Sequence, residues 1–385
     1  MEFIKRLTPL LFIPLLASCT ATEQQRLLDA VAKGKVENEV KSIIKDKEQV
    51  YKSNPEQLIS DVKSIKELLD QLNQRVESVW GKKRTELPDN KRYVKYTNDY
   101  KARAIVDFEK GTLRVETIDT KTPKSMLQQA IVTTLLATAN PKDTDIFSSD
   151  APKPNGKPFL YRQVLDQNKK PIQYQWRANR FADYLVANQM KREKLDALLA
   201  SYVEVPLVSE HLHLRKQEYS EYVLASAKKY DIAPSLIYGV IETESSFNPF
   251  AVSHANAYGL MQVVPSTAGR DVYEKIKNRS GQPTKEVLFD PKQNIDIGTA
   301  YLNILTNRYL SKVVDPTSRH FSIISAYNGG AGNVLNTFSR DRNQAFVKIN
   351  RLSSEQVYRE LTTSHPRAES RRYLYKVHKA EKKYQ

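Results

Sequence analysis

The sequence has little cysteine and glycine, and it lacks a long apolar run. Cys19 is the only cysteine among 385 residues, so the chain can form no internal disulfide. The 12 glycines and 18 prolines are too few for a collagen-like or low-complexity chain. No segment approaches the ~20 consecutive apolar residues of a membrane-spanning helix. At roughly 150 residues per domain, the length predicts two or three globular domains.

Positive charge is in clear excess. Lysine and arginine number 60 against 44 aspartates and glutamates, which gives a formal net charge of +16. This balance favours a polyanionic partner or surface, which could be nucleic acid, acidic lipid or an acidic cell-wall polymer. Net charge bears on association and does not indicate the fold.

The first residues have the pattern of an export signal. Lys5 and Arg6 precede an uncharged apolar segment over residues 7–17, which is too short to cross a bilayer. The segment ends in Leu16-Ala17-Ser18-Cys19, which resembles the lipobox of bacterial lipoproteins, whose cysteine becomes the lipidated first residue. Thr20, rather than aspartate, follows, which in that class indicates the outer membrane. We expect a signal peptide over 1–18 and a lipid anchor at Cys19 on the periplasmic face of the outer membrane of a Gram-negative bacterium. A chance cysteine in an uncleaved terminus is the alternative.

Residues 19–85 are expected to form a lipidated start and a helical spacer of two helices separated near 53–55. The second helix carries an apolar stripe with alternating spacings of four and three: Leu58, Val62, Ile65, Leu69, Leu72, Val76 and Val79. A coiled coil and a helical hairpin folded on itself or on the next domain both fit this stripe.

The rest of the chain predicts an α+β multidomain fold: a small mixed α+β domain over 86–208 and a mainly helical domain over 209–385. In the first we expect hairpins over 104–118 and 160–176 and helices over 123–139 and 179–199, without a catalytic constellation. In the second we expect helices at 212–230, 234–245, 292–310, 319–328, 341–350 and 367–382.

A glutamate on the predicted helix 234–245 is a candidate general acid. Glu244 continues the spacing of Ile237, Val240 and Ile241, so it lies on the apolar face, whereas Glu242 points elsewhere and is expected to be solvated. Burial and the helix C-terminus both favour the protonated carboxyl. A general acid for glycosidic cleavage needs such a proton near neutral pH. A glutamate paired with arginine or with backbone amides is the alternative.

Several motifs appear in a fixed order around this glutamate. They are Glu244-Ser245-Ser246-Phe247, Gly259-Leu260-Met261-Gln262, Ala326-Tyr327-Asn328-Gly329-Gly330, and Glu369 followed four residues later by Tyr373. This series resembles the motifs of the lytic transglycosylases with a goose-lysozyme-like domain. The resemblance implies a lysozyme-like catalytic domain and non-hydrolytic cleavage of peptidoglycan between N-acetylmuramic acid and N-acetylglucosamine, which leaves 1,6-anhydromuramic acid ends and serves cell-wall remodelling and turnover.

The resemblance also implies a role for each matching residue. Glu244 would be the single acid and base, and Tyr327 would orient it or the substrate's acetamido group. Substrate-binding roles fall to Ser253, Met261, Gln262, Asn328, Glu369 and Tyr373, with Met261 lining the cleft and Glu369 a supporting carboxylate. Ordinary core positions for Tyr327 and Met261, and a helix-ending turn at 328–330, are the alternatives.

Other chemistries have little support in the sequence. His211 and His213 lack the helical spacing and the third ligand of a zinc site, so no metal or cofactor is expected. The expected partner is the peptidoglycan glycan strand, and no nucleic acid is expected. A hydrolytic muramidase and a noncatalytic peptidoglycan-binding lipoprotein are the two alternative functions. Retention of function without the Glu244 carboxyl would indicate the second.

Overall fold

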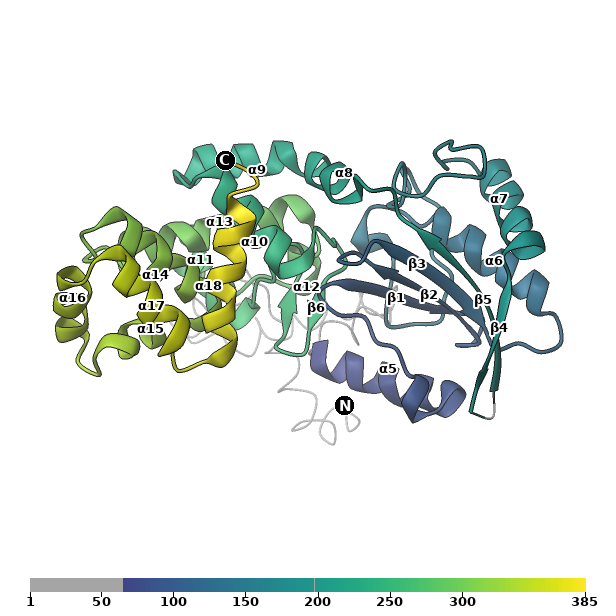
Figure 1. Ribbon diagram of the computed structural model, residues 1–385, viewed down its shortest axis with the longest axis horizontal. Helices are drawn as coiled ribbons and strands as arrows, with labels where there is room; N and C mark the ends of the chain where they lie inside the picture. Colours follow the sequence, from purple (N-terminus) through teal and green to yellow (C-terminus); the bar gives the residue numbers. More distant parts are fainter. Residues whose placement is uncertain (1–64, 197) are drawn as a thin grey trace, which may run out of the picture.

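The computed structural model describes residues 65–196 and 198–385, which form an α+β part followed by a mainly helical part (Figure 1). None of the helices in these ranges is long and apolar enough to cross a bilayer. The predicted signal peptide, Cys19, Leu58 and Val62 lie outside the described residues. The observed architecture agrees with the expected order of a mixed domain before a helical one.

The α+β part is built on an antiparallel sheet with the strand order β1-β2-β3-β5-β4. Its strands are β1 (Arg92–Thr97), β2 (Ala102–Asp107), β3 (Thr112–Thr117), β4 (Lys191–Leu195) and β5 (Leu198–Pro206). The hairpin expected over 104–118 is confirmed as β2 and β3. Helix α6 (Pro123–Leu135) covers one face of the sheet and ends earlier than expected, and α7 (Gln175–Asn188) packs against α6.

Two expectations for this part are wrong. The helix expected over 179–199 is α7 followed by the hairpin of β4 and β5, because residues 198–202 pair with β4 and residues 201–206 pair with the whole of β3. Val203 and Val205 are buried alternately, as in a strand. The hairpin expected over 160–176 is also wrong, because this segment has only isolated bridges, such as Leu165 with Pro171, and α7 already begins at Gln175.

Helix α5 (Ile65–Trp80) packs on the other face of the sheet (Figure 1). Its stripe residues are almost fully buried and join the hydrophobic core of the sheet: Ile65, Leu69, Leu72 and Val76. The guanidinium of Arg103 on β2 lies 3.8 Å from the Trp80 ring and pairs with Glu116 at 2.6 Å. For the described part of the stripe, the structure therefore shows the helix folded on the next domain.

The helical part contains eleven α-helices in the described ranges. They are α8 (His211–Glu218), α9 (Ser220–Tyr230), α10 (Pro234–Ser245), α11 (Arg270–Lys275), α12 (Lys285–Leu288), α13 (Pro291–Ile304), α14 (Pro316–Gly329), α15 (Ala331–Phe338), α16 (Arg342–Arg351), α17 (Ser354–Thr363) and α18 (Ala368–Glu381). The helix predicted over 212–230 is divided at Tyr219 into α8 and α9. A short hairpin of β6 (Val252–Ser253) and β7 (Ala257–Tyr258) interrupts the helices.

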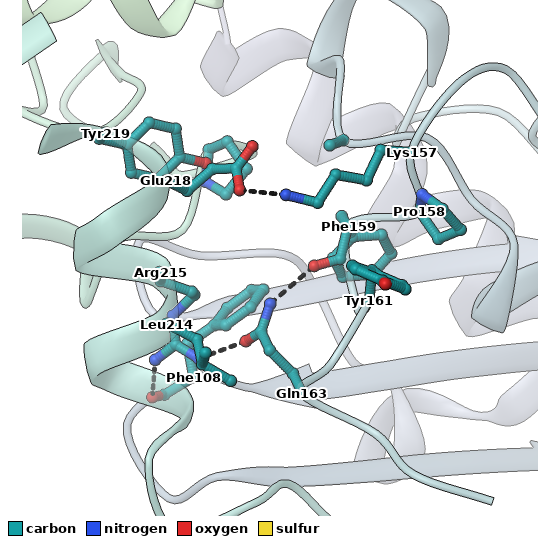
Figure 2. Close-up of a pocket in the computed structure, with 12 residues that line it drawn as sticks. Phe108, Lys157, Pro158, Phe159, Tyr161, Gln163, Leu214, Arg215, Glu218 and Tyr219 are labelled. Atoms are coloured by element: carbon teal, nitrogen blue, oxygen red, sulfur yellow. Dashed lines mark hydrogen bonds and ion pairs between the residues drawn. The ribbon is translucent and has the colours of Figure 1, made fainter. Parts of the chain in front are cut away.

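The two parts are joined by a buried arginine (Figure 2). Arg215 on α8 donates hydrogen bonds to the Phe108 carbonyl at 2.9 Å and to Gln163 Oε1 at 2.8 Å, both in the sheet part. Its Nε donates to the Ser246 carbonyl, directly after α10, at 3.0 Å. The side chain is 4% exposed and borders a cavity of about 40 Å³. Arg215 thus fixes the end of α10 relative to the sheet.

Candidate active site

The candidate acid lies in the last turn of α10. Pro234 occupies the first turn of this helix, where its missing N–H costs no hydrogen bond, and Ser246 ends the helix with a left-handed φ of 50°. Ile237, Val240 and Ile241 are completely buried on the face that the sequence predicts. Glu244 continues this face and is partly buried. The local sequence therefore suffices to place its carboxyl at the edge of the core.

Two residues of the sheet part hold the C-terminal end of α10. Asn90 Nδ2 donates to the Glu244 carbonyl at 2.7 Å, while Lys91 Nζ donates to the Glu242 carbonyl at 2.7 Å and to Ser246 Oγ at 2.9 Å. A helix leaves its last carbonyls without intrahelical partners, and a cation there is also favoured by the helix dipole. The sequence did not indicate that Asn90 and Lys91 hold this helix, because they lie about 150 positions before it and belong to no motif.

The environment of Glu244 favours its protonated form. Burial raises the pKa of this carboxyl from its ordinary value of 4.5 to about 7, and the negative charge of Glu369 acts in the same direction. The Tyr373 hydroxyl and the Lys91 ammonium act against burial and lower the pKa. A carboxyl with a pKa near 7 can both hold and release a proton at neutral pH, as a group that acts first as acid and then as base must do.

Glu242 corrects one expectation from the sequence. It points away from Glu244 as predicted, but it is not solvated: its side chain is 15% exposed and accepts hydrogen bonds from Lys383 Nζ and the Tyr384 hydroxyl. These partners come from the last residues of the chain, directly after α18. Glu242 is therefore a paired structural carboxylate.

Two tyrosines from different helices lie near Glu244. Tyr327 on α14 and Tyr373 on α18 each interact electrostatically with the Glu244 carboxyl, and burial followed by this negative charge raises both tyrosine pKa values well above the ordinary range. The Tyr327 hydroxyl donates to the Met261 carbonyl at 2.8 Å. The buried Tyr373 hydroxyl has no hydrogen-bond partner among the described residues other than its interaction with Glu244. Both hydroxyls stay protonated at neutral pH and can donate hydrogen bonds.

The loop after β7 is fixed by an asparagine that our sequence analysis also missed. Asn294 on α13 is completely buried, accepts from the Met261 amide at 2.8 Å, and donates to the carbonyls of Tyr258 and Leu288 at 2.8 Å each. Gly259 has a φ of +69°, and a Cβ there would lie 2.4 Å from Asn294 Nδ2. A glycine in this motif thus permits both the left-handed turn and the close approach of the asparagine.

The Met261 side chain does not line an open cleft as expected, because it is completely buried. It fills the space beside Gly298, and only its backbone carbonyl takes part in the site, as the acceptor for Tyr327. Gln262 is partly buried and donates to the Gly259 carbonyl at 3.0 Å. Ser253 lies in β6, and its hydroxyl accepts from the Ala255 amide at 3.1 Å.

Asn328 and Glu369 connect α14 with the start of α18. Asn328 Nδ2 donates to Glu369 Oε1 at 3.3 Å, and Asn328 Oδ1 accepts from the Ser370 hydroxyl at 2.6 Å. Glu369 is exposed. Gly330 follows the end of α14 with a φ of 82°, as the predicted helix-ending turn requires. The last two motifs thus meet in space on the side of Glu244 that carries the tyrosines.

Comparison with known proteins gives matches along most of the chain. Residues 51–218 match the family model of the membrane-bound lytic murein transglycosylase C N-terminal domain, and residues 221–350 match the transglycosylase SLT domain. Proteins named membrane-bound lytic murein transglycosylase C from Yersinia pestis (strain Pestoides F) and Yersinia pseudotuberculosis serotype O:1b (strain IP 31758) are each 43% identical to this chain over 383 residues, 99% of either chain. An X-ray structure of an inactive mutant of the lytic transglycosylase Slt from Pseudomonas aeruginosa matches with a TM-score of 0.31 and 22% identity, covering 43% of this chain and 24% of that one.

Proposed function

The chain belongs to the family of membrane-bound lytic murein transglycosylase C, and from this premise we propose that Glu244 is the single acid and base with which it cleaves peptidoglycan. The observation that carries this assignment is the pKa of about 7 at Glu244, a carboxyl at the end of a buried helix with two tyrosine hydroxyls near it. A general acid is most effective when its pKa lies near the working pH.

The reaction needs two proton transfers at the same carboxyl. Protonated Glu244 gives its proton to the oxygen between N-acetylmuramic acid and N-acetylglucosamine, and that glycosidic bond breaks. The substrate's own 2-acetamido group takes the place of a protein nucleophile, as in substrate-assisted glycosidases. Ionised Glu244 then removes the proton of the muramic C6 hydroxyl, whose oxygen closes the 1,6-anhydro ring. No water is consumed.

The neighbouring side chains support this cycle in distinct ways. The Tyr373 hydroxyl donates to the Glu244 carboxyl, so it stabilises the ionised form after the first proton transfer, whereas the Tyr327 hydroxyl donates to the Met261 carbonyl. Glu369 opposes ionisation through its negative charge and holds Asn328. We assign glycan contacts to Asn328, Gln262 and Ser253. Met261 contributes through its carbonyl.

Mass spectrometry of released muropeptides tests this assignment. Wild-type protein, Glu244→Gln and Glu242→Gln are incubated with purified peptidoglycan. We expect 1,6-anhydromuramic acid ends from the wild type and from Glu242→Gln, whose side chain points away from the site, and none from a folded Glu244→Gln. Cleavage by Glu244→Gln would refute the assignment. Products heavier by one water would indicate a muramidase, and no products from any variant would indicate a noncatalytic wall-binding protein.

We propose further that the protein is held at the periplasmic face of the outer membrane by lipid on Cys19. The support is the lipobox-like sequence 16–19, the presence of Thr20 after it and the absence of any other cysteine. The relatives above are named membrane-bound. Cys19→Ala is expected to move the protein from the outer-membrane fraction to the soluble fraction, and unchanged fractionation would contradict the anchor.

A further inference from the structure

Two histidines and a glutamate meet where α14 packs against α18, away from the residues assigned above. His320 belongs to α14, and His378 and Glu381 are three positions apart on one face of α18. One ligand atom from each residue lies within 4.8 Å of the other two. We propose that these three side chains bind a zinc ion. This inference goes beyond the proposed reaction, in which they take no part.

The carboxylate of Glu381 requires a positive partner. The residue is only 3% exposed, and its oxygens accept from His320 Nε2 at 2.8 Å and from the Ser235 hydroxyl at 3.5 Å. A buried carboxylate is costly unless a charge or several hydrogen bonds compensate it. A divalent cation between Glu381 and His320 supplies that charge directly.

His378 provides a ring nitrogen that the protein leaves unused. Its Nδ1 is buried and has no hydrogen-bond partner in the described part of the chain, although such buried polar atoms are normally paired. This nitrogen is therefore free to bind a metal ion.

The donor set favours zinc over magnesium and calcium. Two imidazoles and one carboxylate with an open fourth position are a known zinc arrangement, whereas magnesium and calcium prefer oxygen ligands. Zinc bonds of about 2.0–2.2 Å need only small rotations of ligand atoms that are already this close. Lys379 and Lys382 line the adjacent cavity, and their positive charge acts against any divalent ion, so binding here depends on the bonds to the imidazole nitrogens, which zinc forms and magnesium does not favour.

The surroundings leave access to the site. A cavity of about 590 Å³ opens beside His378, between Phe321, Tyr358 and Tyr375. It offers an entry path and room for a water as the fourth ligand. The ring of His378 packs edge-on against Phe321, with centroids 5.3 Å apart, so its orientation is already restricted.

Zinc here would join the two helices that carry the tyrosines. His320 precedes Tyr327 by about 10 Å along α14 at the ordinary helical rise, so the ion does not reach the reacting sugar. It would instead fix α18, with Tyr373, against α14, with Tyr327. The expected role of the zinc ion is therefore structural: it would hold α14 and α18 together.

Calorimetric titration with zinc chloride tests the proposal. The full-length chain in detergent is stripped with a chelator, dialysed and titrated, with magnesium chloride as a second titrant. We expect one zinc per chain and no heat from magnesium. His378→Gln should weaken zinc binding by at least about tenfold, because even changes outside the ligand set cost a metal site this much. The matched control is His213→Gln, which replaces an exposed histidine on α8 and should bind zinc like the wild type.

Cobalt provides a readout that does not depend on stability. Cobalt bound by this mixed nitrogen and oxygen set should give visible absorption in the wild type and His213→Gln, and little in His378→Gln. If circular dichroism shows that His378→Gln does not fold, His320→Gln replaces it in both experiments. Absence of zinc binding by the wild type, equal affinity in the ligand variant, or loss of binding in His213→Gln would overturn the proposal.

Discussion

Replacing Glu244 with glutamine should stabilise the protein at alkaline pH, because it removes a carboxyl that is costly to ionise in the folded state. Folding raises the pKa of this group from 4.5 to about 7. Between these values the folded chain binds more protons than the unfolded chain, so the wild type loses stability as the pH rises. Below pH 4.5 both states are protonated, and the cost is absent.

The size of the effect follows from the same pKa. The shift corresponds to a cost of about 3 kcal/mol once the group is ionised in both states, at about 1.4 kcal/mol for each pH unit. Glu244 is only partly buried, and solvent screening reduces this value. We therefore expect the free energy of unfolding of Glu244→Gln, measured relative to the wild type, to be about 2–3 kcal/mol higher at alkaline pH than at acid pH.

Calorimetric melting at about pH 4 and about pH 8 measures this difference. For a domain of this size the gain appears as a Tm increase of roughly 4–12 °C in Glu244→Gln at the higher pH, beyond any difference at the lower one. Glu242→Gln is the control, because that carboxylate is paired with Lys383 and Tyr384 and its loss should bring no gain. A Tm difference between Glu244→Gln and the wild type that is the same at both pH values would refute the reasoning.

Three further predictions concern the framework of the site. Lys91→Met removes a charge that lowers the pKa of Glu244, so the alkaline fall in kcat/KM should move to higher pH. The loss of its bond to the end of α10 should also lower the free energy of unfolding by about 1–3 kcal/mol. Lys110→Met, which replaces an exposed lysine, is the control, and an unchanged pH profile of Lys91→Met would contradict the prediction. Arg103→Leu removes one of the two arginines that pair with the buried carboxylate of Glu116 and leaves Arg114 as its partner. The free energy of unfolding in urea should fall by about 1–3 kcal/mol, and a smaller loss would count against the pair. Gly298→Ala places a Cβ 2.5 Å from Met261 Sδ, so it should lower the free energy of unfolding by about 1–3 kcal/mol and slow muropeptide release. Unchanged kinetics would show that the loop containing Met261 can move to accommodate the Cβ.

The parts of the molecule that depend on local sequence could be predicted. Helix α10 has the expected bounds because its apolar spacing, its first-turn proline and its ending are all encoded within about a dozen residues. The position of Glu244 on the buried face followed from the same spacing. Partners from distant segments could not be predicted in this way. Asn90 and Lys91 reach the helix from another domain, and Glu242 meets residues from the end of the chain.

Propensity misled the prediction where pairing decides the structure. Residues 191–199 are rich in lysine, glutamate, leucine and alanine, which favour helix, yet residues 191–195 form β4 and residues 198 and 199 begin β5. Pairing of β5 with β3 outweighs a preference of a few tenths of a kcal/mol per residue. In the same way, the two histidines of the proposed zinc site are far apart in sequence, so no ligand spacing indicated them.

The contact of Asn90 and Lys91 with α10 bears on how this protein can be dissected. The sequence suggests a domain border near residue 209, and a shortened chain starting there would still contain Glu244 and the motifs around it. It would lack the two side chains that bind the carbonyls at the end of α10 and the ammonium that lowers the pKa of the acid. With Glu244 in its proposed role, we expect an isolated helical domain to differ from the intact chain as a catalyst, with a weaker acid in a less rigid helix. The sheet domain would then contribute to catalysis through its contacts with the end of α10.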